Sequence, residues 1–275
     1  MHGVLNTFRE RLHQKVQPEV VESLLHEFSE RQLYHRLLST RLLSSSSKTE
    51  KDGSTHNGIL YLAPANEVSK ATLCPWSTKA CREACIIFSG RLRMKRSRMA
   101  RTLRTIFLLV EPDLFRAQLI LEIMKHLAYG IRHNVQSVVR LNGTSDLQSS
   151  VAFKNLPEAS FFSEIPTLFP EVQFIEYTKN PKFHQVGENQ TITFSYSGTN
   201  QHHALKLLKQ GKNVSVIFDG PFPETWNTSS VIDGDSHDNR FKDPQTGIVV
   251  GLKLKGTKSV CRKARQGKLA VPSAL

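Results

Sequence analysis

Apolar residues recur at helical spacing near the start of the chain. Between residues 16 and 43 this spacing is carried by Val20, Val21, Leu24, Leu25, Phe28, Leu33, Leu37 and Leu38. The pattern predicts one or two amphipathic helices, which we assign to a helical N-terminal extension over residues 1–43. The polar run at 44–57 opens with four serines and predicts a linker or surface loop.

From residue 59 onward, short apolar and β-branched runs alternate with helical segments. The strand-like runs cover residues 59–63, 137–141, 172–177, 191–196, 214–218 and 248–252. Helices are expected at 91–109 and at 112–129, and a third is expected to be capped by Thr199 or Asn200 and to end at Gly211. This alternation predicts an α/β fold with a mainly parallel sheet of about six strands, arranged as an incomplete (β/α) barrel or a doubly wound sheet.

Three cysteines lie in the loop that would follow the first strand. Cys74, Cys81 and Cys85 form a C-x6-C-x3-C pattern. Cys81 and Cys85 are four residues apart, which predicts that they share one face of a helical turn. Thiolates favour zinc, copper(I) or iron–sulfur clusters over hard cations. The loop therefore predicts a metal centre, and we favour an iron–sulfur cluster of the 4Fe–4S type, with one iron left open.

Zinc is the alternative metal for this loop. A structural zinc site usually has four protein ligands, so Cys261, His56 or His237 would have to complete the set. A further alternative is that the three cysteines are reduced and pack as small apolar side chains. Four cysteines in 275 residues do not resemble a secreted disulfide scaffold.

The charge of the chain is concentrated in two stretches. The net charge is +13, and residues 91–104 and 253–268 each hold seven Lys or Arg and no acid. The rest of the chain has 23 basic and 24 acidic residues, so its charge is balanced. Clustered positive charge attracts polyanions, so we expect these stretches to bind nucleic acid. The alternative is a solvated helix face followed by a loose basic C-terminal tail over residues 258–275.

No apolar run approaches the length of a membrane span, and the first ten residues lack the apolar centre of a signal peptide. We therefore expect a cytoplasmic protein with no membrane partner. The sequence leaves the oligomeric state open.

Polar residues gather at the ends of the expected strands. In parallel α/β proteins these ends meet at one rim and carry the functional residues. We assign catalytic roles to Asp146, Tyr177 and Lys179, and cofactor-binding roles to Asn142, Thr144 and Ser195. The alternative for any single residue is an ordinary turn former.

Two further groups are candidates for the site. Asp235 and His237 lie in a dense acidic, Gly-containing turn and are candidate acid–base or metal-binding residues. Arg91, Arg101 and Arg104 follow the cysteine loop, and Arg101 and Arg104 share a helix face that could bind the phosphates of nucleic acid or an anionic cofactor. A turn closed by hydrogen bonds and an ion-paired structural helix are the respective alternatives.

The motifs in this order resemble the phage and prophage family of gene product 88-like proteins. They are ILYLAPA at 59–65, LCP at 73–75 with Cys81 and Cys85, ARTLRT at 100–105, VRLNGTSDL at 139–147, YTK at 177–179, TFSYS at 193–197, IDGD at 232–235 and VGLK at 250–253. The resemblance covers about residues 40 to 257, so we take residues 44–257 as the family domain. It implies a phage or plasmid origin and no particular activity.

A more distant resemblance is to radical S-adenosylmethionine enzymes. They carry a three-cysteine loop after the first strand of a (β/α) barrel, and the open iron of their cluster binds S-adenosylmethionine. The spacing here differs from their C-x3-C-x2-C pattern, and no Gly-Gly-Glu motif follows the next strand. The resemblance implies S-adenosylmethionine as a further cofactor.

Three hypotheses follow for the function of the chain. The first is a phage-type iron–sulfur enzyme of radical S-adenosylmethionine-like architecture that acts on or near nucleic acid. The second is a non-catalytic nucleic-acid-binding protein held together by zinc. The third is a structural phage protein whose cysteines are simply buried.

Overall fold

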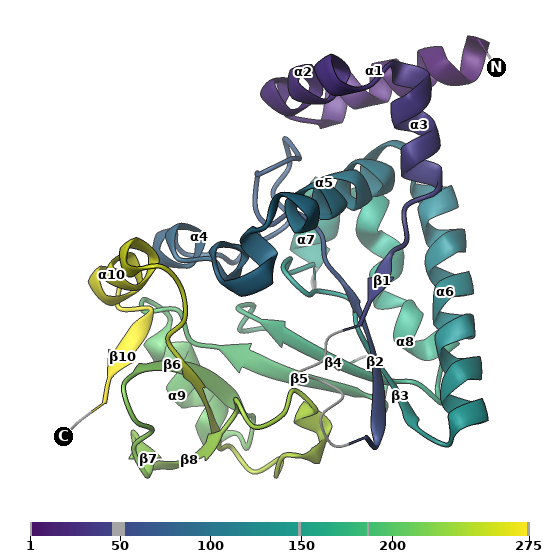
Figure 1. Cartoon of the computed structure of the whole chain (residues 1–275). Helices are drawn as coiled ribbons and strands as arrows, with labels where there is room; N and C mark the ends of the chain where they lie inside the picture. Colours follow the sequence, from purple (N-terminus) through teal and green to yellow (C-terminus); the bar gives the residue numbers. More distant parts are fainter. Residues whose placement is uncertain (1, 46–52, 148–149, 186, 274–275) are drawn as a thin grey trace.

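The N-terminal extension consists of three helices that pack on the main domain. In the computed structural model, which describes residues 2–45, 53–147, 150–185 and 187–273, they are α1 (His2–Lys15), α2 (Pro18–Glu27) and α3 (Glu30–Leu38). Pro18 begins α2, and Ser29 and Gln32 form a capping box that begins α3. Two helices thus lie within residues 16–43, as expected, and α1 precedes them. Figure 1 shows these helices at the top, over α5 (Lys95–Val110).

The contact between the extension and α5 is apolar. Phe8 and Leu12 of α1 are fully buried in the same cluster as Ile106 and Phe107 of α5. Burying a Leu or Phe side chain contributes about 1.5–3 kcal/mol each. The extension is therefore part of the main hydrophobic core.

The centre of the domain is a mostly parallel sheet of ten strands among the described residues. Six strands lie side by side in chain order and run parallel: β2 (Thr55–Leu60), β3 (Gln136–Arg140), β4 (Gln173–Thr178), β5 (Gln190–Ser195), β6 (Val214–Asp219) and β9 (Val249–Lys253). They correspond to the six runs expected from the sequence. Their apolar residues are buried, as for parallel strands covered on both faces.

Four further strands make the sheet larger than the expected six. They are β1 (Leu43–Ser44), β7 (Thr225–Trp226), β8 (Ser229–Asp233) and β10 (Ala270–Pro272). Three of them have only two or three residues, and β8 carries serines, so none has a strong apolar pattern. The sheet path runs from β1 at one edge to β7 at the other, and the sheet is therefore open.

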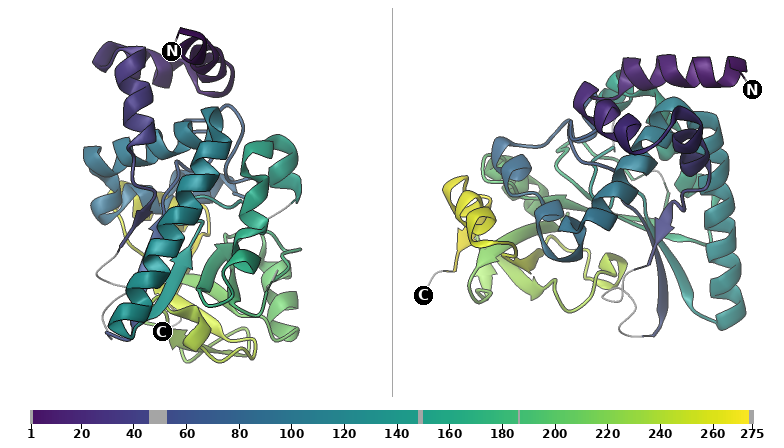
Figure 2. Two further views of the ribbon diagram at one scale, coloured as in Figure 1. Left: turned by 90° about the vertical axis from the view of Figure 1, so that its right-hand side faces the viewer. Right: turned by 45° about the horizontal axis from the view of Figure 1, so that its top comes forward.

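Helices cover the sheet and lie near the expected positions (Figures 1 and 2). The expected helix at 91–109 begins as a short 3-10 turn, η2 (Gly90–Arg93), and continues as α5. The next helix, α6 (Pro112–His133), packs against β2 and β3, and α9 (Gln201–Lys209) packs against β5 and β6. The remaining helical elements are α4 (Lys79–Glu83), η1 (Ile86–Phe88), α7 (Ser150–Asn155), η3 (Pro157–Ser163), α8 (Ile165–Leu168), η4 (Arg240–Lys242) and α10 (Lys258–Gln266).

The C-terminal segment is folded, and the expectation of a loose tail was wrong. The helix α10 packs on α4, and β10 pairs in parallel with the second half of β6. The register explains how β6 accepts this strand: β5 pairs with residues 214 and 215 of β6, while β10 pairs with residues 217–219. Half of the expected linker at 44–57 is residues 46–52, which lie outside the described residues. Of its described part, Ser44 belongs to β1 and residues 55–57 belong to β2, so the linker expectation was wrong there. Within the described ranges, no helix is both long and apolar enough to span a membrane.

Candidate metal centre and adjoining cavity

Cys74 lies where the ends of β2 and β3 meet. Its Sγ accepts a hydrogen bond from the backbone N–H of Ala65 at 3.3 Å, and the thiol contacts the backbone oxygen of Thr144 at 3.8 Å. The backbone N–H of Asp146 donates to the oxygen of Leu73 at 2.9 Å, so the segment after β3 is also bonded to the start of the cysteine loop. The cysteine loop is thus fastened to the carboxyl end of the sheet, where the sequence predicted it.

Cys81 and Cys85 lie on either side of the end of a short helix. Cys81 is in α4, where its backbone N–H donates to the capping hydroxyl of Thr78 at 3.1 Å. The last helical bond of α4 is from Ala84 to Ala80, and Cys85 has extended backbone angles. The expected helical turn therefore ends one residue before Cys85. Both cysteines are half-buried.

Lys179 follows β4, and its ammonium group interacts electrostatically with all three cysteines. Burial raises the pKa of Cys74 to about 12 and that of Cys85 to about 11, so both are neutral thiols near neutral pH in the metal-free chain. Burial acts to lower the pKa of Lys179, but Cys81, Asp146 and the other two cysteines together hold it above its ordinary value. Lys179 would therefore stabilise the thiolate form of any of the three cysteines that loses its proton.

A ready-made site for a single metal ion is absent from the described part of the chain. No group of three or more His, Cys, Asp or Glu side chains there is arranged to hold one ion. A tetrahedral zinc ion with 2.3 Å bonds would need its sulfur ligands only about 3.8 Å apart. A cluster divides its cysteines among several irons and does not impose that spacing.

Of the candidate fourth ligands, the two histidines have other partners, and Cys261 lies on the helix α10, which packs on α4. The ring of His56, at the start of β2, stacks on His126 with centroids 4.0 Å apart, at the opposite end of the strand from the cysteine loop. His237 Nδ1 lies 3.1 Å from a guanidinium nitrogen of Arg240. Cys261 is half-buried on α10.

Asn142, Thr144 and Asp146 are buried and form hydrogen bonds within the protein. Asn142 Oδ1 accepts bonds from the hydroxyl of Ser145 and the N–H of Leu147, both at 2.9 Å. The hydroxyl of Thr144 donates to the oxygen of Leu62 at 2.5 Å. Asp146 accepts from the Thr178 hydroxyl at 2.7 Å and the Lys179 N–H at 2.9 Å. Of the three, Asp146 has the direct link to Lys179.

Tyr177 and Ser195 occupy neighbouring strands but different surroundings. Burial raises the pKa of Tyr177 to about 12, and the guanidinium of Arg140 lies 4.7 Å from its ring centroid. Ser195 accepts a bond from the Ser215 hydroxyl at 3.2 Å. Neither side chain has a described contact with the cysteines.

The acidic turn is engaged in ion pairs. Asp235 pairs with Lys255 at 2.5 Å and accepts from the N–H of Lys253 at 3.0 Å. His237 and Asp243 flank the fully buried Arg240, which lies 3.2 Å from Asp243. These contacts give the turn a structural role beside β8 and β9, and the acid–base or metal-binding role of Asp235 and His237 stays a prediction.

The three arginines after the cysteine loop fall into two classes. Arg91 is exposed. Arg104 is buried and donates to the oxygen of Arg41 and the hydroxyl of Ser44, both at 2.8 Å, which are structural contacts. Arg101 is buried and donates to the oxygen of Leu92 at 2.7 Å, while its Nε has no hydrogen-bond partner. Burial lowers the pKa of Arg101, and the charges of Glu67 and Cys85 oppose that shift.

Sequence reasoning missed Glu176 because it lies inside a strand and not at its end. Its side chain is fully buried and accepts bonds from the N–H groups of Leu141 at 2.8 Å and Asn142 at 3.2 Å. Burial raises the pKa of Glu176 to about 7. It holds the start of the segment that carries Thr144 and Asp146. A glutamate within the apolar run 172–177 was the available signal.

A cavity of about 200 Å³ adjoins the cysteine loop. It is lined by Trp76 and Thr78 of that loop, by Lys179, and by residues around the start of α9, including Ser197 and His202. The cavity therefore opens at the carboxyl ends of β4 and β5, next to the loop that carries the cysteines.

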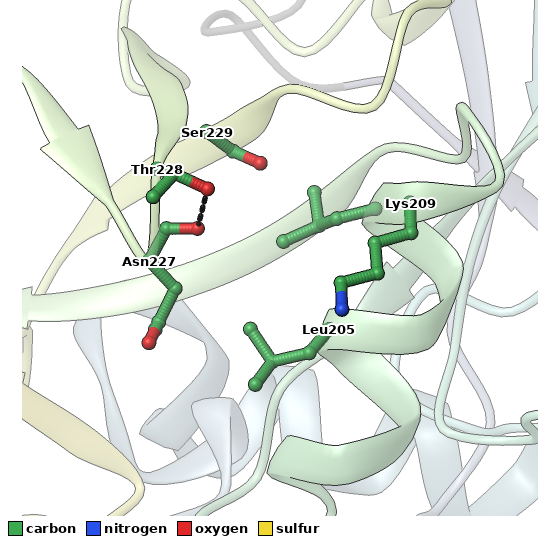
Figure 3. Close-up of a pocket in the computed structure, with 6 residues that line it drawn as sticks. Leu205, Lys209, Asn227, Thr228 and Ser229 are labelled. Carbon is green, nitrogen blue, oxygen red and sulfur yellow. Dashed lines mark hydrogen bonds between the residues drawn. The ribbon is translucent and has the colours of Figure 1, made fainter.

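A larger cavity of about 430 Å³ lies away from the cysteines. Figure 3 shows it between Leu205 and Lys209 of α9 and the turn that joins β7 to β8, where the Thr228 hydroxyl donates to the oxygen of Asn227 at 2.5 Å. Its lining has no cysteine, histidine or carboxylate. We therefore place the candidate site at the smaller cavity.

A family model described as gene product 88 matches residues 36–268. The match includes the cysteine loop, all the strand ends described above and α10, and it leaves out most of the three N-terminal helices. A search of curated proteins and a search of solved structures each found no match. Because the family model covers well over half of the chain, the chain belongs to the gene product 88 family.

Proposed function

We propose that the chain is an iron–sulfur enzyme in which Cys74, Cys81 and Cys85 hold a 4Fe–4S cluster. The observation that carries the proposal is that three half-buried cysteines lie in one loop at the carboxyl end of a parallel sheet, where all three interact electrostatically with Lys179. Thiolates are the ligands that such clusters require. When bound, a cluster with three protein ligands would supply an open iron for a substrate or cofactor, with S-adenosylmethionine as the candidate.

The charges around the loop fit an anionic cluster. Three thiolates bring negative charge into a half-buried loop, and a buried charge is stable only where it is paired. Lys179 interacts electrostatically with all three cysteines, and Arg101, which interacts in the same way with Cys85, has a buried Nε without a hydrogen-bond partner. These two cations would compensate the charge that metal binding creates.

The strand order also supports the proposal. Six parallel strands succeed one another in chain order, as in an incomplete (β/α) barrel, and the cysteine loop follows the first of them. The functional residues of such folds lie at the carboxyl ends of the strands. Lys179 and the cavity beside Trp76 lie at that end.

Nucleic acid is the proposed substrate or partner because the two basic stretches meet in space. The Ser89 hydroxyl, just before the first stretch, donates to the oxygen of Lys255 in the second at 3.0 Å. Arg91, Arg96 and Arg262 are among the exposed cations of the two stretches. Clustered exposed cations of this kind bind phosphates and make the affinity depend steeply on salt.

Cysteine variants test the metal site. Serine in place of Cys74, Cys81 or Cys85 should remove most of the iron bound per chain, while Cys261→Ser, the matched control, should retain it. Equal loss in all four variants would contradict a three-cysteine cluster. Addition of S-adenosylmethionine to the reduced protein should change its electron paramagnetic resonance spectrum, and an unchanged spectrum would remove that cofactor from the proposal.

The second candidate is a zinc-held nucleic-acid-binding protein. It is favoured by the packing of α10, which carries Cys261, on α4, which carries Cys81. Cys261 would then be the fourth ligand of a four-cysteine zinc site. In that case Cys261→Ser should lose zinc and stability together, because structural zinc binding is coupled to folding.

A further inference from the structure

The first turn of α9 faces the cavity beside the cysteine loop without a side-chain cap. The nine-residue helix begins after Asn200, whose side chain forms no capping bond to the helix. Instead Asn200 Oδ1 accepts from the N–H of Ser197 at 2.7 Å, and its Nδ2 donates to the oxygen of Ser195 at 3.0 Å. The first N–H groups of a helix have no acceptor within the helix, so this end is electropositive and has donors to offer.

A second, independent feature points to a ligand in the same place. Ser197 lines the cavity and is fully buried, yet its hydroxyl oxygen has no hydrogen-bond partner. A buried polar atom without a partner costs about 1–3 kcal/mol. A ligand acceptor in the cavity would supply the missing partner.

The remaining lining groups fit an anion. Lys179 contributes an ammonium group, and His202 and His203 contribute imidazoles whose ring centroids lie 3.8 Å apart. The lining contains no Asp or Glu. Trp76 provides an aromatic surface next to these donors, as recognition of a base or sugar ring uses.

From this combination we infer that the cavity binds the phosphate group of a nucleoside monophosphate, with the phosphate at the start of α9 and against Ser197 and Lys179. Helix N-termini with added hydroxyl and cationic donors are established phosphate sites. The inference deepens the proposed function by naming the substrate class at the same site. It needs no metal, because none of the residues that carry it is a cysteine.

The test is calorimetric titration of the full chain with a nucleoside 5′-monophosphate, with inorganic phosphate and with the unphosphorylated nucleoside. We expect the monophosphate to bind at least about 10-fold more tightly than the nucleoside, the change that corresponds to a hydrogen bond to a charged group. Inorganic phosphate should compete with it. Equal binding of nucleoside and monophosphate, or no binding of either phosphate, would overturn the inference.

Two variants connect the binding to the residues. Ser197→Ala should weaken monophosphate binding about 10-fold while leaving the melting temperature unchanged or higher, because it removes a buried hydroxyl without a partner. His202→Ala, at an exposed position, should weaken binding, whereas His35→Ala, an exposed histidine on α3, should not. Unchanged affinity in both cavity variants would contradict the site.

Titrations with iron-loaded and metal-free protein separate this inference from the proposed cluster. Binding in both forms supports the phosphate site whatever the metal content. If neither form binds the monophosphate while the iron-loaded form has a proven cluster, the phosphate site is refuted and the cluster proposal stands.

Discussion

Two buried groups affect stability in opposite directions as the pH changes. Glu176 is fully buried, and its pKa is raised by burial from 4.5 to about 7. His126 is 8% exposed, and its pKa is lowered by burial from 6.5 to about 4. His126 Nε2 lies 3.0 Å from the oxygen of His56 and 3.2 Å from that of Val138, contacts that the neutral ring makes as a donor.

The signs follow from which state holds the proton. Between pH 4.5 and about 7 the folded chain keeps the proton of Glu176 that the unfolded chain has lost, so its contribution to stability falls as the pH rises. Between about pH 4 and pH 6.5 the unfolded chain protonates His126 and the folded chain does not. The contribution of His126 is therefore fully present above pH 6.5 and is lost as the pH falls toward about 4.

The two contributions nearly cancel in the natural chain. A pKa unit corresponds to about 1.36 kcal/mol, so from about pH 5 to about pH 6.5 each group changes the free energy of unfolding by about 2 kcal/mol, in opposite directions. Glu176→Gln removes one contribution, so its stability relative to the natural chain should rise by about 2 kcal/mol over this interval. For His126→Gln, the free energy of unfolding relative to the natural chain should fall by about the same amount over this interval.

Urea unfolding followed by circular dichroism at several pH values measures these differences. The double variant should again resemble the natural chain in its pH dependence, and Glu171→Gln, at an exposed position, should shift no pH dependence. If the single variants differ from the natural chain by the same free energy at every pH, the assigned burial of these two charges is refuted.

Further predictions concern stability. Gly143→Ala should destabilise by about 1–3 kcal/mol, because a Cβ there would lie 2.8 Å from the oxygen of Leu60, and urea unfolding would measure it. Arg104→Met should lower the melting temperature whereas Arg91→Met should not, since Arg104 is buried and hydrogen-bonded and Arg91 is exposed. Leu12→Ala should lower the free energy of unfolding by about 2–5 kcal/mol if the extension belongs to the core. A separate unfolding step of the extension at low urea would contradict that.

The main elements of the fold could be predicted from the sequence because their apolar patterns are strong. The six parallel strands and the helices α5, α6 and α9 lie within a few residues of their expected positions. The short edge strands could not be recognised, because two or three residues carry no periodicity. The strand β10 also depends on a gap beside β6, which only the assembled sheet creates.

The candidate site could also be predicted only in part from the sequence. The cysteine pattern identified the loop, but charge alone did not reveal that Arg104 is buried and bonded within the protein. A cap at Thr199 or Asn200 was expected. The side chain of Asn200 instead bonds to the backbone of Ser195 and Ser197 and leaves the helix end uncapped, which depends on backbone geometry. The electrostatic interaction of Lys179 with the cysteines depends on the sheet, because Lys179 follows β4 and the cysteine loop follows β2.

The most direct test of the central claim is analysis of iron, acid-labile sulfide and zinc in anaerobically purified protein, together with its absorption spectrum. The account predicts about four irons and four sulfides per chain and broad absorption near about 400 nm, all lost in Cys74→Ser. A colourless protein with one zinc per chain, or a protein with no metal at all, would contradict it.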